Sequence, residues 1–108
     1  MDAVLLTKPN GTILDVNPAS EKLFGYSKKE MIELGRQGII DSDDPRLPGL
    51  IEEIEHKGKT KGELIFVKKD GSKFPAEISS NIFREKDGIE KTIMVISDIS
   101  DRLKAEET

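Results

Sequence analysis

Two short apolar runs open the chain, at residues 3–7 and 12–16. They flank the turn sequence Pro9-Asn10-Gly11, in which asparagine and glycine tolerate the unusual backbone angles of a tight turn. Runs of this length on either side of such a turn predict a β-hairpin.

Three longer runs of strand character close the chain, at residues 63–69, 73–84 and 90–99. Asp-Gly dipeptides at 70–71 and 87–88 separate them, and each can supply the positive φ angles of a hairpin turn. The pattern predicts a three-stranded antiparallel meander from Gly62 to Ile99. In its middle run apolar and polar residues alternate, as in a sheet with one covered and one polar face. The covered face would carry Phe74, Ala76, Ile78, Ser80 and Ile82.

Two short helices are predicted between the hairpin and the meander. Asn17 is a favoured N-cap residue, Pro18 suits the first helical position, and Gly25 is a typical C-terminal stop. Ser27 and Glu30 have the spacing of a capping box, which predicts that a second helix begins there.

A third, longer helix is predicted after a loop at residues 41–45. Its apolar residues follow the spacing i, i+3, i+4, i+7, which places them on one face, and Gly58 ends the pattern. This stripe consists of Leu47, Leu50, Ile51 and Ile54. Strands at both ends and helices between them predict an α+β domain with the helices on one face of the sheet.

Residues 103–107 favour a helix directly after the last predicted strand. Ser100 can cap this helix, and Asp101 in its first turn suits the positive end of the helix dipole. The alternative is a frayed tail. Because a helix this short is marginal in isolation, we expect residues 103–108 to be the start of a longer C-terminal signalling helix.

The composition fits one globular domain of 108 residues and 12.0 kDa. Lysine and arginine number 17 against 21 acidic residues, and the net charge of −4 disfavours a nucleic-acid or anionic-membrane surface. The absence of cysteine excludes disulfides, thiolate metal sites and thiol nucleophiles, and one histidine excludes multi-histidine metal cages. The chain has no basic, apolar leader and no apolar run of membrane-spanning length. We therefore expect a cytoplasmic domain without membrane contact and identify no metal site.

No catalytic motif accompanies this pattern. The sequence has no Gly-x-Ser-x-Gly elbow, phosphate-binding loop or dinucleotide fingerprint. The serines predicted on strands have no histidine near them, because the sole histidine, His56, falls on the polar side of the long helix. We expect this chain not to be an enzyme, although the full-length protein can be one.

Four stretches of the sequence resemble the PAS domain family in order and spacing. They are residues 11–19 (GTILDVNPA), 23–27 (LFGYS), 68–79 (KKDGSKFPAEIS) and 98–102 (DISDR). The resemblance covers residues 3–102 and implies one PAS sensory domain at 1–102. It also implies a five-stranded antiparallel sheet in the order 2-1-5-4-3, with helices that cover one face and enclose a small-molecule pocket.

The resemblance also implies how the domain is used. PAS domains are sensory and dimerisation modules, most often ahead of histidine kinases, diguanylate cyclases or further PAS domains. Their last strand passes its signal through a short turn into a coiled coil. That exit turn corresponds here to Asp98, Ser100, Asp101 and Arg102, where Ser100 replaces the usual threonine and keeps a hydroxyl for the cap.

Two cofactor classes of the family are argued against by the residues. Flavin photoreceptors carry a cysteine in a Gly-x-Asn-Cys stretch, and the matching segment, residues 35–38, contains no thiol. Haem-binding members place a histidine early on the long helix, at a position that falls at or near Leu47. His56 instead points away from the apolar stripe. We identify no cofactor and leave open an unknown small ligand.

The candidates for lining a pocket are apolar residues of the helices and of the meander. Plain core packing is the alternative for each of them. Only 5% of the residues are aromatic, which favours a small ligand or a collapsed pocket over a bulky chromophore. These candidates are Met31, Ile32, Ile39, Ile40, Leu50, Ile54, Phe66, Ile78, Met94 and Ile96.

Arg36 and Arg46 lie in the loops around the expected pocket mouth and are candidate polar ligand contacts. An arginine there can hold a carboxylate through two parallel hydrogen bonds. The alternative is an internal Asp–Arg network with residues 41–44 that orders the loop.

Two functions fit the sequence. The first is a sensory module that regulates a downstream output domain in the same chain, with a histidine kinase as the first candidate, through small-molecule binding, homodimerisation or both. The second is a ligand-free dimerisation or relay scaffold with a filled core. The volume of the cavity distinguishes them.

Overall fold

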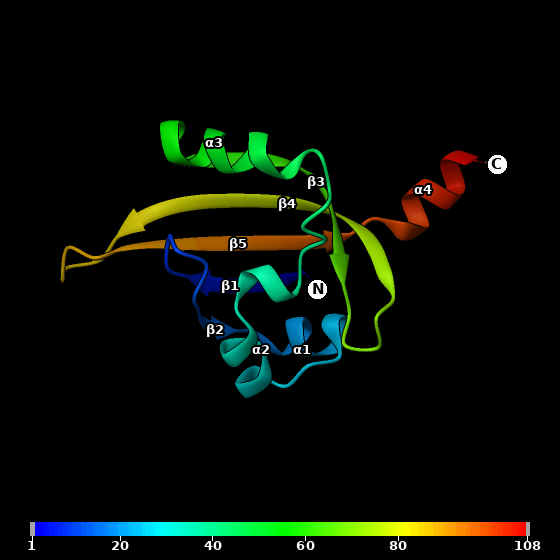
Figure 1. The fold of residues 1–108 in the computed structure, drawn as a ribbon, viewed down its shortest axis with the longest axis horizontal. Coiled ribbons are helices and arrows are strands. Elements are labelled where there is room, and N and C mark those ends of the chain that lie inside the picture. The colour runs from blue at the N-terminus through cyan, green and yellow to red at the C-terminus, as the bar shows by residue number, and fades with distance from the viewer. Residues whose placement is uncertain (1, 108) are drawn as a thin grey trace.

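A computed structural model describes residues 2–107, which form one mixed sheet-and-helix unit (Figure 1). The elements, in chain order, are strands β1 (Ala3–Thr7) and β2 (Ile13–Val16), helices α1 (Pro18–Phe24) and α2 (Lys28–Leu34), the 3₁₀ turn η1 (Arg36–Gly38), helix α3 (Leu47–Lys57), strands β3 (Lys59–Val67), β4 (Lys73–Arg84) and β5 (Glu90–Asp98), and helix α4 (Ser100–Glu107).

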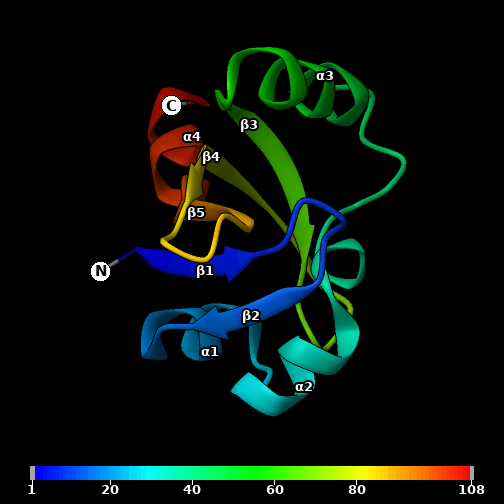
Figure 2. The same cartoon turned by 90° about the vertical axis from the view of Figure 1, so that its left-hand side faces the viewer.

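The five strands form a single antiparallel sheet in the order β2-β1-β5-β4-β3. The first and last strands are neighbours, in a register that runs from Ala3 opposite Ile96 to Thr7 opposite Thr92. The sheet curves strongly, and α1, α2 and α3 pack on its strands (Figure 2). The predicted α+β class, strand order and placement of the opening hairpin in the same sheet as the meander are confirmed.

The predicted caps fix where the first helices begin. Asn17 Oδ1 accepts hydrogen bonds from the backbone N–H groups of Ser20 and Val4, both at 3.0 Å, so one side chain joins α1 to β1. Ser27 and Glu30 form both bonds of the predicted capping box, at 3.1 and 2.9 Å. The entry of the chain into both helices is therefore local and readable from the sequence.

The core occupies the face of the sheet that the helices cover. In β4, Phe74, Ala76, Ile78 and Ser80 are buried as the alternation predicts. The ring centroids of Phe24, Phe66 and Phe74 lie 5.5–5.9 Å apart, an aromatic cluster that fills one end of the core.

Strand β3 differs most from its prediction. It begins at Lys59 rather than at residue 63, because its polar first residues pair by backbone with β4, Lys59 opposite Asn81 and Thr60 opposite Ser80. It ends at Val67, and the backbone N–H of Lys68 instead donates to Ser72 across the turn at 2.9 Å. Backbone pairing requires no apolar alternation, so this part of the strand has no signature in the sequence.

The exit from β5 into α4 is confirmed, but its cap is not the predicted one. Ser100 is already the first helical residue, and both its N–H and its hydroxyl donate to Asp98 Oδ1, at 2.8 and 2.6 Å. Asp98, not Ser100, therefore supplies the acceptor at the start of α4. The N–H of Ile99 also donates to the carbonyl of Pro75, which fixes the exit to β4 at 3.1 Å.

Helix α4 and the tip of the β4–β5 hairpin lie at opposite ends of the long axis of the molecule (Figure 1). Within residues 2–107, no helix combines the length and the apolar composition needed to cross a membrane.

Candidate functional site

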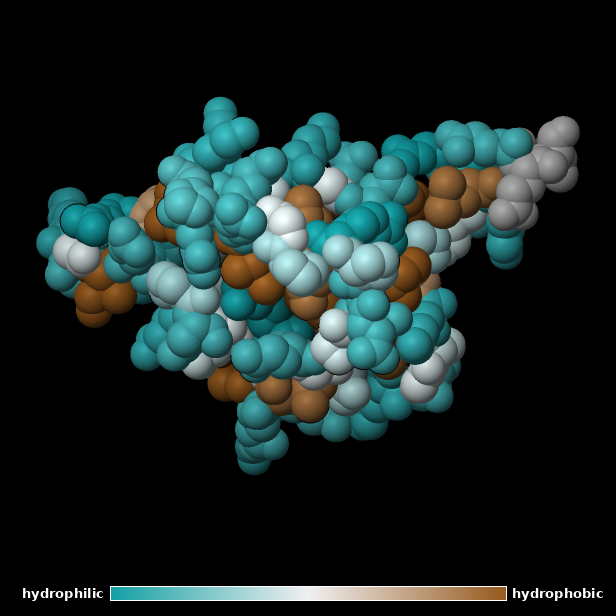
Figure 3. All heavy atoms as spheres, turned by 45° about the horizontal axis from the view of Figure 1, so that its top comes forward, coloured by the Kyte–Doolittle hydropathy of each residue, from teal (hydrophilic) through white to brown (hydrophobic). Residues whose placement is uncertain are grey.

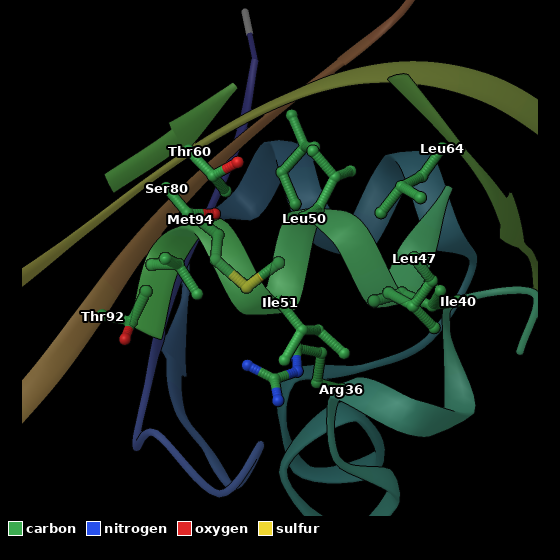
Figure 4. A pocket seen from close by; sticks show the side chains of 12 residues that line it. Arg36, Ile40, Leu47, Leu50, Ile51, Thr60, Leu64, Ser80, Thr92 and Met94 are labelled. Atoms are coloured by element: carbon green, nitrogen blue, oxygen red, sulfur yellow. The ribbon is translucent and has the colours of Figure 1, made fainter. Parts of the chain in front are cut away.

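A cavity of about 40 Å³ lies between α3 and the strands β3, β4 and β5 (Figure 4). Aliphatic side chains of α3 form its roof, and hydroxyl-bearing strand residues form part of its floor. It is lined by Arg36, Ile40, Leu47, Leu50, Ile51, Ile54, Thr60, Leu64, Ile78, Ser80, Thr92 and Met94.

Helix α3 covers this cavity, although its side chains are at most partly buried. None of its eleven residues is buried, and Ile51 retains 37% of its exposure. Apolar atoms remain visible between polar side chains on the face where α3 lies (Figure 3). The helix nevertheless approaches β3 closely at one point, because a Cβ on Gly62 would come within 2.8 Å of Leu50 Cδ2. Because α3 covers the cavity, it is named the lid helix.

Three buried hydroxyls give the floor of the cavity its polar character, those of Thr60, Ser80 and Thr92. The Thr60 hydroxyl donates to Glu53 Oε1 of the lid helix at 2.9 Å, a side-chain tie between lid and sheet. Thr7 pairs with Thr92 across the β1–β5 ladder, is fully buried, and its Oγ1 has no hydrogen-bond partner. Such an unpaired buried hydroxyl costs about 1–3 kcal/mol, so this end of the core is not optimised for packing alone.

Arg36 reaches the cavity from η1, on the opposite side from Thr60 and Ser80 (Figure 4). Its backbone N–H donates to the carbonyl of Gly11 at 2.9 Å. Its guanidinium lies over the same glycine, where a Cβ would be 3.5 Å from Nη2, and Gly11 has a φ of 95°. Burial lowers the pKa of the Arg36 guanidinium. No carboxylate of residues 2–107 lies within ion-pair distance of it, and arginine stays charged at neutral pH.

Arg46 has the opposite environment. Its Nε and Nη2 donate to the two carboxylate oxygens of Asp44, at 3.0 and 2.9 Å. The Asp44 side chain is 1% exposed and also accepts from the N–H of Ile65 at 2.9 Å. The hydrogen bonds from Arg46 and from the backbone hold the pKa of the Asp44 carboxyl well below its usual range. The predicted Asp–Arg network is thus present for Arg46, and it anchors the loop before α3 to β3.

The structure separates the predicted pocket residues into three groups. Arg36, Ile40, Leu50, Ile54, Ile78 and Met94 line the cavity. Four further candidates are completely buried in the core, as the alternative of plain core packing predicts. These are Met31, Ile39, Phe66 and Ile96. Ile32 does not line this cavity; it is 37% exposed on α2, where it borders a separate surface hollow with Lys28, Lys29 and Glu33. Met31 faces the core, and adjacent residues of a helix point in directions about 100° apart.

Six lining residues were not predicted, although two kinds of signal point to them. Leu47 and Ile51 belong to the apolar stripe of the lid helix, and Ser80 lies on the face of β4 predicted to be covered. Thr60, Leu64 and Thr92 have no such individual signal, because their positions depend on the register of β3 and β5.

At the predicted exit turn, Arg102 of α4 lies near two carboxylates of the outer sheet face. Its guanidinium nitrogens are 3.8 Å from Glu77 and 4.0 Å from Glu63, on β4 and β3. The predicted exit residues therefore connect α4 to the strands beneath the lid helix.

The sequence profile of the PAS domain family matches residues 1–101. The chain belongs to the PAS domain family. A solved PAS domain from Colwellia psychrerythraea superposes with a TM-score of 0.82 at 28% identity, over 94% of this chain and 88% of that one. PAS domains are generally sensory, non-catalytic modules of signalling proteins, and the resemblance stated from the sequence is confirmed.

Two curated PAS relatives carry sensor names. The methyl sulfide methyltransferase-associated sensor of Methanosarcina acetivorans is 34% identical over 111 residues, which cover 97% of this chain and 11% of that protein. The oxygen sensor protein DosP of Escherichia coli is 38% identical over 79 residues, which cover 68% of this chain and 10% of that protein. The PAS chain thus spans about a tenth of the length of each.

The buried Asp44 carboxylate provides the first prediction. Asp44→Asn should lower the free energy of unfolding at pH 7 by about 1–3 kcal/mol, because a charged acceptor of four hydrogen bonds is lost. Urea denaturation measures this difference, and Asp43→Asn on the exposed neighbour is the matched control.

The same pair of variants tests the sign of the pH dependence. Since folding lowers the pKa of Asp44, its contribution is complete above the ordinary carboxyl pKa of about 4 and is lost as the pH falls toward the folded value. The difference in the free energy of unfolding between wild type and Asp44→Asn should therefore become smaller in acid. An equal difference at pH 7 and pH 3 would contradict the lowered pKa of Asp44.

Proposed function

We propose that this PAS domain is a ligand sensor, in which a small molecule enters the cavity beneath the lid helix and changes the position of α4. The observation that carries the proposal is a cavity roofed by a helix with no buried residue, beside an arginine that has no acidic partner in the described part of the chain. Lid, floor and exit are physically connected, because β4 and β5 form the floor and β5 continues into α4.

A ligand can act in this way only if it binds two conformations unequally. The lid helix supplies the conformational difference in our proposal. It contacts the sheet through the Glu53–Thr60 bond and the close approach of Leu50 to Gly62, and Leu47 and Leu50 pack against the core. In our proposal these contacts change while the core stays folded. A ligand that contacts the lid in one position and not in the other would therefore shift the equilibrium.

We propose that neither haem nor a flavin bonded to cysteine is the ligand. The described lining residues include no histidine, and His56 is exposed on the lid helix. The sequence has no cysteine to bond a flavin. The cavity of about 40 Å³ is also far smaller than the ~300–1,000 Å³ of clefts that hold drug-sized molecules. The residues do not fit either group.

The small volume is also the observation that favours the second candidate, a ligand-free dimerisation or relay scaffold. A space of about 40 Å³ has room for roughly three water-sized groups, at about 10–15 Å³ each. In this second candidate the cavity holds only water. The sheet and α4 then transmit signals that come from neighbouring domains.

Native mass spectrometry of the purified chain distinguishes the two candidates. We expect a bound small molecule that is lost in Ser80→Val, which fills the cavity, and retained in Ser79→Val, which alters the opposite sheet face. A ligand that binds only the folded state stabilises that state. Protein that carries the bound molecule should therefore have a higher melting temperature than protein without it. Sensing is contradicted if no small molecule travels with the wild type and Ser80→Val leaves regulation of the full-length protein unchanged.

We propose that the output domain follows α4 in the same chain and is a histidine kinase, one of the outputs that PAS domains most often precede. In this proposal residues 1–102 sense and the helix from residue 103 onward transmits. The absence of catalysis in this chain and its cytoplasmic location stay predictions, as does the absence of nucleic-acid partners.

Coupling through the exit turn provides a matched pair of variants. Asp98→Ala should remove the acceptor at the start of α4 and abolish signal-dependent output of the full-length protein, while the domain stays folded. Asp70→Ala is the control, because Asp70 accepts from the N–H and the hydroxyl of Ser72 at the same distances, 2.8 and 2.6 Å, in the β3–β4 turn instead of at the start of α4. Equal regulation in both variants would contradict a coupling role.

We also propose that the domain forms a homodimer through its outer sheet face. Val4 lies opposite Val95 and Leu6 opposite Ile93 in the β1–β5 ladder, and these four side chains form a contiguous apolar patch on the uncovered face. Apolar area of this kind is buried in stable protein interfaces.

Sedimentation of single-residue variants tests this interface. Ile93→Glu should convert a dimer into a monomer, because it places a charge in the apolar patch. Ile89→Glu, at a comparably exposed isoleucine in the β4–β5 turn, should leave the dimer intact. A wild-type chain that remains monomeric, also when extended by further residues of the signalling helix, would contradict the proposal.

A further inference from the structure

The two arginines near the cavity differ in one respect that bears on the ligand. Arg46 uses its Nε and Nη2 on the buried carboxylate of Asp44, whereas Arg36 has no acidic partner among residues 2–107. Arg36 is partly removed from water, and this burial is not offset by a neighbouring charge. A half-buried guanidinium with free donors is a site for an anion that the protein itself does not supply.

The remainder of the lining limits what that anion can be. Most of the roof and walls are aliphatic, among them Leu50, Ile51 and Met94. A phosphate group or a dicarboxylate would need several charged donors, and Arg36 is the only cationic residue of the lining. The ligand should therefore carry one negative charge and an apolar body.

The size of the cavity limits the length of the apolar part of the ligand. A volume of about 40 Å³ accommodates roughly three water-sized groups, at about 10–15 Å³ each. An exposed fraction of 37% at Ile51 indicates that the lid helix has apolar surface left to close over a body of this size.

We infer that the cavity binds a short-chain aliphatic monocarboxylate, with its carboxylate on the Arg36 guanidinium and its alkyl chain beneath the lid helix. This inference rests on the proposed sensory function and names the class of ligand. The hydroxyl of Thr92, which lines the cavity, is a candidate for a second donor.

Titrations of the isotope-labelled chain monitored by amide chemical shifts test the inference. The probes are acetate, propionate and butyrate, with propionamide as a neutral analogue of the same shape and inorganic phosphate as an anion without an apolar body. Propionate should shift amides around the cavity, and propionamide and phosphate should bind at least about tenfold more weakly, because each lacks one of the two contacts.

Three arginine variants assign the head-group contact. Arg36→Gln should weaken propionate binding by about tenfold or more, and Arg36→Lys should weaken it less, because lysine keeps the charge but not the two-pronged geometry. Arg84→Gln removes the same charge from an exposed arginine paired with Glu90 and should have no effect. If Arg36→Gln fails to fold, Arg36→Lys together with Thr92→Val, which removes only a hydroxyl, carries the test.

The outcomes separate this inference from the proposed function. If propionamide binds as tightly as propionate, or if Arg36→Gln and Arg84→Gln behave alike, the carboxylate class is wrong and the sensory function stands. Equal binding of phosphate would make Arg36 a general anion site and overturn the class as well. If no carboxylate binds at all, the class is wrong, and the presence or absence of a co-purifying molecule decides the proposed function.

Discussion

The pairing of β1 with β5 is the contact on which the rest of this structure depends. Five residue pairs, from Ala3 opposite Ile96 to Thr7 opposite Thr92, join the opening hairpin to the closing meander. The two segments are separated by most of the chain, so this contact carries a large loop-closure entropy. In return it places α1, α2 and α3 over one continuous surface, and it makes β5, the strand that continues into α4, the central strand of the sheet. Any movement of β5 is therefore felt by β1 and β4 on either side.

Local chemistry made most of this fold predictable. Turn dipeptides, the Asn17 cap and the Ser27–Glu30 box each act within a few residues, and the structure confirms each of them. The start of β3 was not predictable, because Lys59 and Thr60 join the sheet through backbone pairing that leaves no mark on the pattern of side chains.

The cavity was predictable only in part, for the same physical reason. The apolar stripe of the lid helix identified its roof, whereas Thr60 and Thr92 on the floor are set by strand register over long sequence distances. Sequence also gave no means to distinguish Arg36 from Arg46. The position of one carboxylate, that of Asp44, makes Arg46 a structural residue, whereas the guanidinium of Arg36 has no carboxylate partner within residues 2–107.

The core has two ends of different character, and this division has energetic consequences. Phe24, Phe66 and Phe74 fill one end with closely packed rings. The other end holds buried hydroxyls, including the unpaired one of Thr7, beneath a helix that buries none of its residues. A sheet supported firmly at one end can tolerate repacking at the other, which is what a sensor needs and a purely structural domain does not.

In the proposed sensory mechanism the lid helix, which has no fully buried residue, is the element that moves. Gly49 in its first turns costs about 1 kcal/mol relative to alanine, and its side-chain tie to the sheet is the Glu53–Thr60 bond. Moving a two-state equilibrium from 1:99 to 99:1 needs about 5.5 kcal/mol of differential binding. Burial of about three methylene-sized groups supplies roughly 2.4 kcal/mol of it. A charge-assisted hydrogen bond to Arg36 adds about 1.5–3 kcal/mol. A ligand small enough for this cavity therefore approaches a full switch only if its apolar body and its charged head both contribute in one lid position and not in the other.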